Sequence, residues 1–221
     1  MPDGAKTVLT EFQEAYHSAR HAVPSDDMLA SLISQPVTDL IASDKTIQCK
    51  AGCAYCCHLR VTAYVYEIVG IYQRLQKLPA EQLDAACQRI EAQYAEIKEL
   101  TVQKRRERNI TCPMLVEDHC IVHEVRPVSC AGHHSTDVYR CQDGFLYPDV
   151  TEITYEHPGV PMLQSVKTEQ SAQEQLARQV IKEAGDNPEK VELISSLYQL
   201  FADPDLVRQW QQGEQILCEG N

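Results

Sequence analysis

The chain lacks long hydrophobic runs. None of the apolar segments among its 221 residues approaches the roughly 18–20 residues that a membrane-spanning helix needs, so no membrane partner is expected. Glycine (9 residues) and proline (11 residues) are too scarce for a collagenous or low-complexity chain. The first residues also lack the successive charged, apolar and small-residue zones of a signal peptide. We therefore expect a globular protein of the cytoplasm.

Basic residues are also few compared with acidic ones. Lys and Arg total 20 against 32 Asp and Glu, which gives a formal net charge of -12. A chain of this charge is repelled by phosphate backbones and anionic lipid surfaces, so nucleic acid is not an expected partner. No Ser-His-Asp arrangement, phosphate-binding loop or dinucleotide motif occurs either.

Helical periodicity runs through most of the sequence. Apolar residues recur every three to four positions, and we expect a mainly α-helical, single domain over residues 1–221. In this organisation, N-terminal helices (residues 6–44) and C-terminal helices (residues 160–216) flank a cysteine-cluster core at residues 49–141. Further helices are predicted over 61–76, where a strand remains an alternative, and over 80–108, 163–184, 188–201 and 204–216. Residues 109–158 lose the periodicity, and we expect loops there, ordered by a metal.

The cysteine content is unusually high, with ten cysteines in the chain. In a reducing compartment, clustered cysteines indicate metal ligands or redox thiols before they indicate disulfides. The first cluster is a C-x3-C-x2-C-C run formed by Cys49, Cys53, Cys56 and Cys57. Adjacent cysteines such as Cys56 and Cys57 do not easily bind one tetrahedral ion together, because their side chains diverge. The run therefore predicts two metal centres, or one cluster and a separate role for one thiol.

A second cluster lies downstream, with cysteines at Cys112, Cys120, Cys130 and Cys141. The two clusters together supply eight thiols, enough for two four-thiolate sites or for one iron–sulfur cluster with thiols to spare. We expect folding and metal binding to be coupled, because metal lowers the pKa of thiols and neutralises part of their charge. Cys87 falls on the apolar stripe of residues 80–108 and is expected to be structural.

This pattern resembles the YkgJ-like cysteine-cluster family of zinc- or iron-chelating proteins. The resemblance rests on C-x3-C-x2-C-C followed by C-P-x-L, C-x5-R-P-x-x-C and a further cysteine, between Cys49 and Cys141. It implies that all eight cysteines are metal-site residues and that Arg126 hydrogen-bonds near the thiolates. Flagellin lysine methylases have a similar cysteine pattern.

Two functions follow from these observations. The first is an iron–sulfur or iron protein with a redox or catalytic role of the modification or methylation type, acting on a protein or peptide substrate. The alternative is a structural zinc protein with two thiolate sites that serves as a protein-interaction module.

Cys49, Cys53, Tyr55 and Cys56 also resemble the C-x3-C-x-aromatic-C fingerprint of radical S-adenosylmethionine enzymes. That resemblance makes S-adenosylmethionine a candidate partner. The residues after Cys57 follow a helical pattern, however, and lack the regular strand–helix alternation of that family's partial barrel.

Histidines near the cysteines are further candidate ligands: His58, His119, His123, His133 and His134. The segment from His133 to Asp137 combines acid, base and hydroxyl groups directly after Cys130. We expect this segment to contact a substrate or the metal-binding residues themselves.

Overall fold

The computed structural model describes residues 3–21, 28–150, 154 and 157–217. Within this part of the chain the fold is mainly helical, which confirms the predicted class. The α-helices are α1 (Asp3–His21), α2 (Met28–Ser43), α3 (Val65–Gln76), α4 (Ala80–Ile97), α5 (Val102–Arg106), α6 (Val128–Ala131), α7 (Val138–Leu146), α8 (Gln164–Glu183), α9 (Leu193–Ala202) and α10 (Asp205–Gln211). Two 3-10 turns, η1 (Tyr55–His58) and η2 (His123–Val125), complete the helical elements of that part. Cys218 lies outside the described residues.

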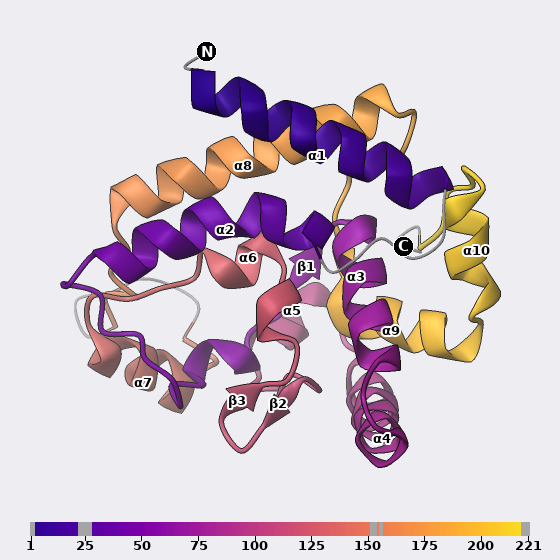
Figure 1. Ribbon diagram of the computed structural model, residues 1–221. Helices are drawn as coiled ribbons and strands as arrows, with labels where there is room; N and C mark the ends of the chain where they lie inside the picture. Colours follow the sequence, from indigo (N-terminus) through magenta and orange to yellow (C-terminus); the bar gives the residue numbers. More distant parts are fainter. Residues whose placement is uncertain (1–2, 22–27, 151–153, 155–156, 218–221) are drawn as a thin grey trace.

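The long helices pack in two groups (Figure 1). In the first, α2 lies against α1, α8 and α6, and α1 also contacts α8. In the second, α9 lies against α3 and α4, and α10 joins α9 to α1. Helix α7 and the small hairpin of residues 115–120 lie below α2 and α6 in this view. No helix among the described residues has the length and hydrophobicity needed to cross a membrane.

Strand structure in the described residues consists of two short antiparallel pairs. Strands β1 (Thr62–Ala63) and β4 (Val191–Glu192) pair Thr62 with Glu192, which ties the start of α3 to the start of α9. Strands β2 (Leu115–Val116) and β3 (His119–Cys120) pair Leu115 with Cys120 and form a hairpin.

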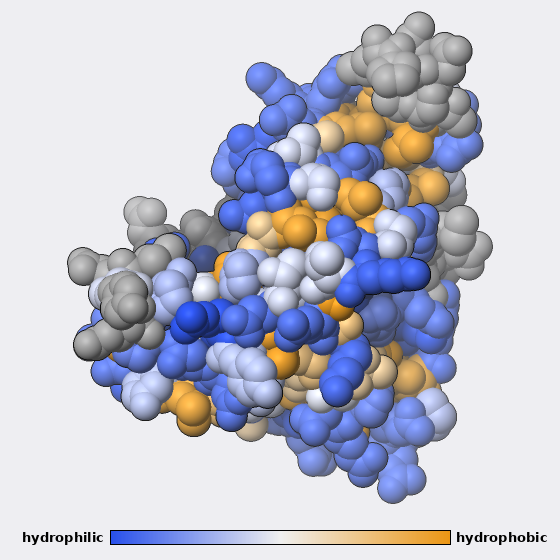
Figure 2. All heavy atoms as spheres, turned by 90° about the vertical axis from the view of Figure 1, so that its left-hand side faces the viewer, coloured by the Kyte–Doolittle hydropathy of each residue, from blue (hydrophilic) through white to orange (hydrophobic). Residues whose placement is uncertain are grey.

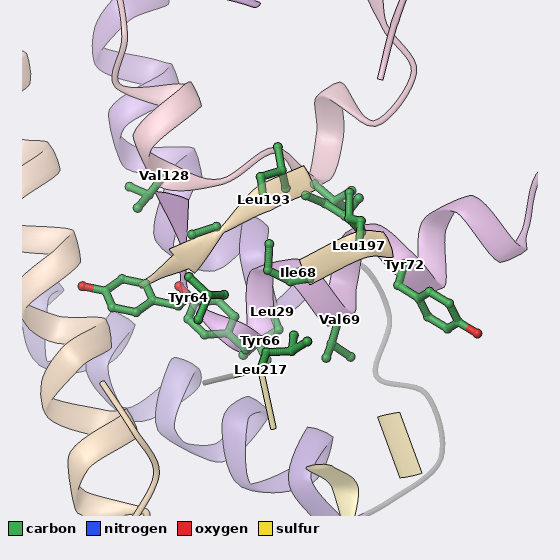
Figure 3. Close-up of a cluster of buried hydrophobic side chains, with 14 of the residues drawn as sticks. Leu29, Tyr64, Tyr66, Ile68, Val69, Tyr72, Val128, Leu193, Leu197 and Leu217 are labelled. Atoms are coloured by element: carbon green, nitrogen blue, oxygen red, sulfur yellow. The ribbon is translucent and has the colours of Figure 1, made fainter. Parts of the chain in front are cut away.

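Much of the hydrophobic core lies around helix α3 (Figure 3). Tyr66 and Ile68 are buried, as are Leu193 and Leu197 of α9. The Tyr66 ring lies 5.4 Å from that of Phe12 in α1, in an edge-on arrangement. Burying these large side chains supplies most of the driving force for packing the two helix groups together. The helix predicted over residues 61–76 is confirmed from Val65 onward, where α3 begins. The two residues Thr62 and Ala63 before it form strand β1.

The structure departs from the sequence prediction at four places. The helix predicted over 204–216 is the shorter α10, which ends at Gln211. The helix predicted over 80–108 is divided into α4 and α5, because the Thr101 side chain accepts a hydrogen bond from the Lys104 backbone and caps a new helix. Segment 109–158 contains the nine-residue α7, capped by Asp137, which accepts from the Tyr139 backbone. The helix predicted from residue 188 begins only at Leu193, where the Glu192 carboxylate accepts from the Ser195 backbone at 2.7 Å.

A buried ion pair joins the N-terminal helix to the C-terminal part. Arg20 pairs with Asp186, and the two side chains are only 5% and 8% exposed. The Tyr16 hydroxyl donates to the other oxygen of Asp186 at 2.6 Å. The Arg20 guanidinium also lies 5.1 Å from the centre of the Trp210 ring. These contacts satisfy both charges away from water.

We expect Asp186→Ala to lower the free energy of unfolding by about 3–5 kcal/mol, because Arg20 is left buried without its anion. Glu189→Ala is the matched control: its ion pair with Arg178 is exposed and contributes roughly 0–1 kcal/mol. Urea denaturation of both variants measures the difference. Equal losses in the two variants would contradict the importance of the buried pair.

The β2–β3 turn is strained. Glu117 and Asp118 adopt φ values of 48° and 59°, a left-handed conformation that favours glycine and asparagine. Asp118→Gly is therefore expected to raise the free energy of unfolding by about 1 kcal/mol. Thermal unfolding measures the change. Asp118→Ala, which keeps the strain, should bring no gain, and a gain of equal size there would contradict the explanation.

Candidate metal centre

The first cysteine cluster is a turn followed by a short helical segment. The Cys53 backbone N–H donates to the Lys50 carbonyl at 3.0 Å, and Gly52 provides the positive φ of 82° that this turn requires. Cys56 and Cys57 follow in η1. The segment from Cys49 to Cys57 is therefore not a continuous helix. Its thiols are positioned by tertiary contacts rather than by helical spacing.

Backbone contacts bring the second cluster to the first. The Cys112 N–H donates to the Cys57 carbonyl at 2.7 Å, although 55 positions separate the two residues in the sequence. The hairpin then returns the chain, with Cys120 in β3 opposite Leu115. Cys130 follows in α6 and Cys141 in α7. The two clusters therefore meet at the contact between Cys57 and Cys112, and the nine described cysteines are free thiols.

Helix α7 is held beside η1 by aromatic contacts. The Phe145 ring lies 4.8 Å from that of His58 and 5.7 Å from that of Tyr55. No side chain of α7 is buried, and Tyr139 is 76% exposed. Figure 2 shows the side of the molecule on which α7 lies, where hydrophilic residues predominate and hydrophobic ones form patches between them.

Two sets of thiols can be distinguished by the charges that act on each sulfur. We call Cys49, Cys53 and Cys141 the loop set, and Cys112, Cys120 and Cys130 the hairpin set. Burial raises the pKa of Cys49, and the neighbouring thiols of Cys53 and Cys56 raise it further. Burial likewise raises the pKa of Cys141, with added effects from the loop set and Cys56.

In the hairpin set, burial raises the pKa of Cys130 well above its usual value, and Cys112, Cys56 and Cys120 raise it further. Burial raises the pKa of Cys112 to about 12. Cys120 has a pKa raised by burial and by Cys56. Desolvation and mutual repulsion therefore keep these thiols protonated until something neutralises their charge.

Backbone N–H groups point at three of the sulfurs. The Ser135 N–H donates to the Cys49 Sγ at 3.3 Å. The Met114 N–H is hydrogen-bonded to Cys112 and the Val122 N–H to Cys120, and each bond acts to lower the pKa of its thiol. Such bonds favour the thiolate form over the thiol. Where thiolates bind iron, hydrogen bonds to the sulfur atoms also help to set the reduction potential of the centre.

Arg126 is a cation close to several of the thiols. Burial lowers the pKa of its guanidinium, while nearby thiols raise it: Cys130, Cys120, Cys56 and Cys57. The guanidinium donates to the Nε2 of His123 and, at 3.4 Å, to the Thr38 hydroxyl. Arg126 therefore lies near thiols of both clusters, while its hydrogen bonds go to His123 and Thr38.

The five candidate histidines have different surroundings. Both ring nitrogens of His134 are engaged, since Nδ1 contacts the Gly132 carbonyl at 2.8 Å and Nε2 accepts from the Leu163 N–H at 2.8 Å. Buried His134 therefore joins the cysteine segment to the start of α8 and has no nitrogen left for a metal. Nδ1 contacts a backbone oxygen in His58 and His119 as well. Burial lowers the pKa of His133.

The predicted segment from His133 to Asp137 lies against the loop set. Besides its N–H bond to Cys49, Ser135 is hydrogen-bonded to the Cys141 thiol, and its carbonyl accepts from the Gln48 N–H at 2.9 Å. Asp137 caps α7. These residues therefore position the metal-site candidates rather than forming a separate site.

Glu67, which the sequence analysis missed, anchors the hairpin set. This fully buried carboxylate accepts from the Tyr64 N–H at 2.9 Å and from the Val128 N–H at 2.8 Å. It thus links the start of α3 to the start of α6, the helix that carries Cys130. Because Tyr64 is not one of the Ser, Thr, Asp or Asn residues that mark a helix start, the sequence carries no signature of this role.

Burial raises the pKa of Glu67 to about 7, above its usual value of 4.5. Its contribution to stability is therefore full below about pH 4.5 and is lost as pH rises through 7. Relative to Glu67→Gln, the wild-type free energy of unfolding should fall by about 3 kcal/mol between pH 4.5 and 8. Chemical denaturation across this range measures it. A difference independent of pH would contradict the assignment.

Among the described residues, no group of three or more His, Cys, Asp or Glu side chains is arranged so as to hold a metal ion. The donor chemistry nevertheless fits a soft or borderline metal, because thiols with N–H partners and a nearby cation are gathered in one region. Comparison of the chain with protein-family models, curated proteins and solved structures finds no match.

Proposed function

We propose that this protein binds metal through its clustered cysteines, as an iron or iron–sulfur centre with a redox or catalytic role. The observation that carries the proposal is that the two cysteine clusters meet at the Cys112–Cys57 backbone hydrogen bond, with Arg126 beside thiols of both clusters. The resemblance to the YkgJ-like family supports the same function.

Metal binding would resolve the electrostatic problem of the site. Burial and repulsion oppose thiolates at Cys112 and Cys130, and a bound cation offsets both costs. The ligand side chains would close on the ion as their protons leave, so binding and local folding would be coupled. Iron would supply redox or Lewis-acid chemistry. The chain would supply the thiolates, the N–H bonds from Ser135, Met114 and Val122, and the charge of Arg126.

The exposed position of Cys49 favours a centre that meets other molecules. A protein or peptide substrate for a modification reaction, and S-adenosylmethionine as a cofactor, are the partners we propose for it. The acidic charge of the chain argues against nucleic acid. The cytoplasm, where thiols stay reduced, is the proposed location.

Zinc is the second candidate. The hairpin set favours it, because Cys112 and Cys120 pack against the hydrophobic core. Closed sites away from water are typical of structural zinc. In this case the protein would be an interaction module.

Metal analysis tests the proposal. Protein purified without oxygen and without a metal-binding tag should contain iron, with or without acid-labile sulfide. About two zinc ions per chain and no sulfide would favour the second candidate. Cys130→Ser should lower the metal content by at least half, because the ion loses a ligand.

Cys87→Ser is the control, since Cys87 lies in α4, outside both cysteine clusters. Its metal content should equal that of the wild type. Wild-type protein without metal under these conditions would overturn the proposal.

A further inference from the structure

Helix α7, at the edge of the molecule (Figure 1), carries an exposed apolar face. Seven large hydrophobic side chains are exposed among the described residues, and four of them lie between positions 139 and 150. Tyr139 and Leu146, in the helix itself, are the most exposed of the seven, at 76% and 60%. Tyr147 and Val150 follow the helix and are exposed as well. Such a concentration of apolar surface indicates an interaction site.

A different face of α7 holds the helix in place. The Phe145 ring packs on the rings of Tyr55 and His58 in η1, at 5.7 and 4.8 Å. Tyr139 and Leu146 are two helical turns apart, so they share one face and lie about 10 Å apart along the helix axis. Because Phe145 already makes the contact with η1, the face of Tyr139 and Leu146 is left open to solvent.

This open face adjoins the exposed end of the first cysteine cluster. The Val138 N–H, at the start of α7, donates to the Gln48 side chain at 2.9 Å. The Gln48 N–H donates to the Ser135 carbonyl, also at 2.9 Å. Cys49, the next residue, is exposed. A molecule that binds along α7 would therefore lie beside the cysteine region.

Charge decides which partner fits this face. Residues 137–150 contain three aspartates and one arginine, and the whole chain has a net charge of -12. Asp137 is paired with Arg140 at 3.8 Å, whereas Asp149 is exposed beside Val150. A second copy of this chain or an anionic membrane would bring like charge to the surface. A partner with basic residues is attracted to it instead.

We infer that this face of α7, formed by Tyr139, Leu146, Tyr147 and Val150, is the docking surface for a basic amphipathic helix of a partner protein. Apolar side chains at helical spacing on the partner would pack on Tyr139 and Leu146. Its Lys and Arg side chains would face Asp149. Docking of this kind needs no metal, so the inference goes beyond the proposed metal binding, and either can fail without the other.

Two synthetic peptides serve as probes for the surface. Both are amphipathic helices of about 18 residues with the same leucine face, and the polar face carries lysine in one and glutamate in the other. Each is labelled and titrated with the full-length chain, and fluorescence anisotropy measures the dissociation constant. The lysine peptide should bind at least about tenfold more tightly than the glutamate peptide.

Leu146→Ser and Tyr139→Ser should each weaken binding of the lysine peptide at least about tenfold, because each removes an apolar anchor of the complex. Val102→Ser is the matched control, since Val102 in α5 is 49% exposed and lies outside the surface; its affinity should equal that of the wild type. Asp149→Asn should weaken binding about twofold. Circular dichroism checks that the variants keep their helices.

Three results would overturn the inference: no binding of the lysine peptide, equal binding of the two peptides, or a loss in Val102→Ser as large as that in Leu146→Ser. Sedimentation of the wild type is a further test. Self-association that Leu146→Ser abolishes would assign the surface to a second copy of the chain and would also overturn the inference. Metal content should be the same in Leu146→Ser and the wild type, which keeps this test separate from that of the proposed function.

Discussion

The buried carboxylate of Glu67 is the contact on which the position of the cysteines depends. It accepts hydrogen bonds from the backbone N–H groups of Tyr64, at the start of α3, and Val128, at the start of α6. Val128 lies 61 positions from Glu67 in the sequence. Because α3 is part of the core, this contact fixes Cys130 relative to the packed helices. The Ser129 hydroxyl adds a bond to the Thr62 carbonyl at 2.9 Å. The carboxylate is desolvated, and its two N–H partners offset part of that cost.

From this anchor, the rest of the cysteine region is built by backbone hydrogen bonds rather than by a hydrophobic stripe. The Cys57 carbonyl holds the chain before the hairpin, Ser135 holds the loop with Cys49, and His134 ties the segment to α8. Such contacts leave the thiols close together but protonated, since burial raises their pKa values.

Helical periodicity predicted the mainly helical fold because apolar stripes at three-to-four spacing survive into the structure, as in α3, α4 and α9. The break before α5 was not predictable from the stripe, since the Thr101 cap decides it. Helix α7 was missed because it buries no side chain. Cysteine spacing selected the candidate residues, but the hydrogen bonds from Cys112 to Cys57 and from Ser135 to Cys49 are long-range contacts that no local pattern encodes.

The central claim is that the clustered thiols bind a metal. X-ray absorption at the metal edge, on protein purified without oxygen, tests it most directly because it identifies the ligand atoms. The account predicts a shell of sulfur neighbours, at about 2.3 Å if the metal is zinc. A shell made only of nitrogen and oxygen atoms would contradict it.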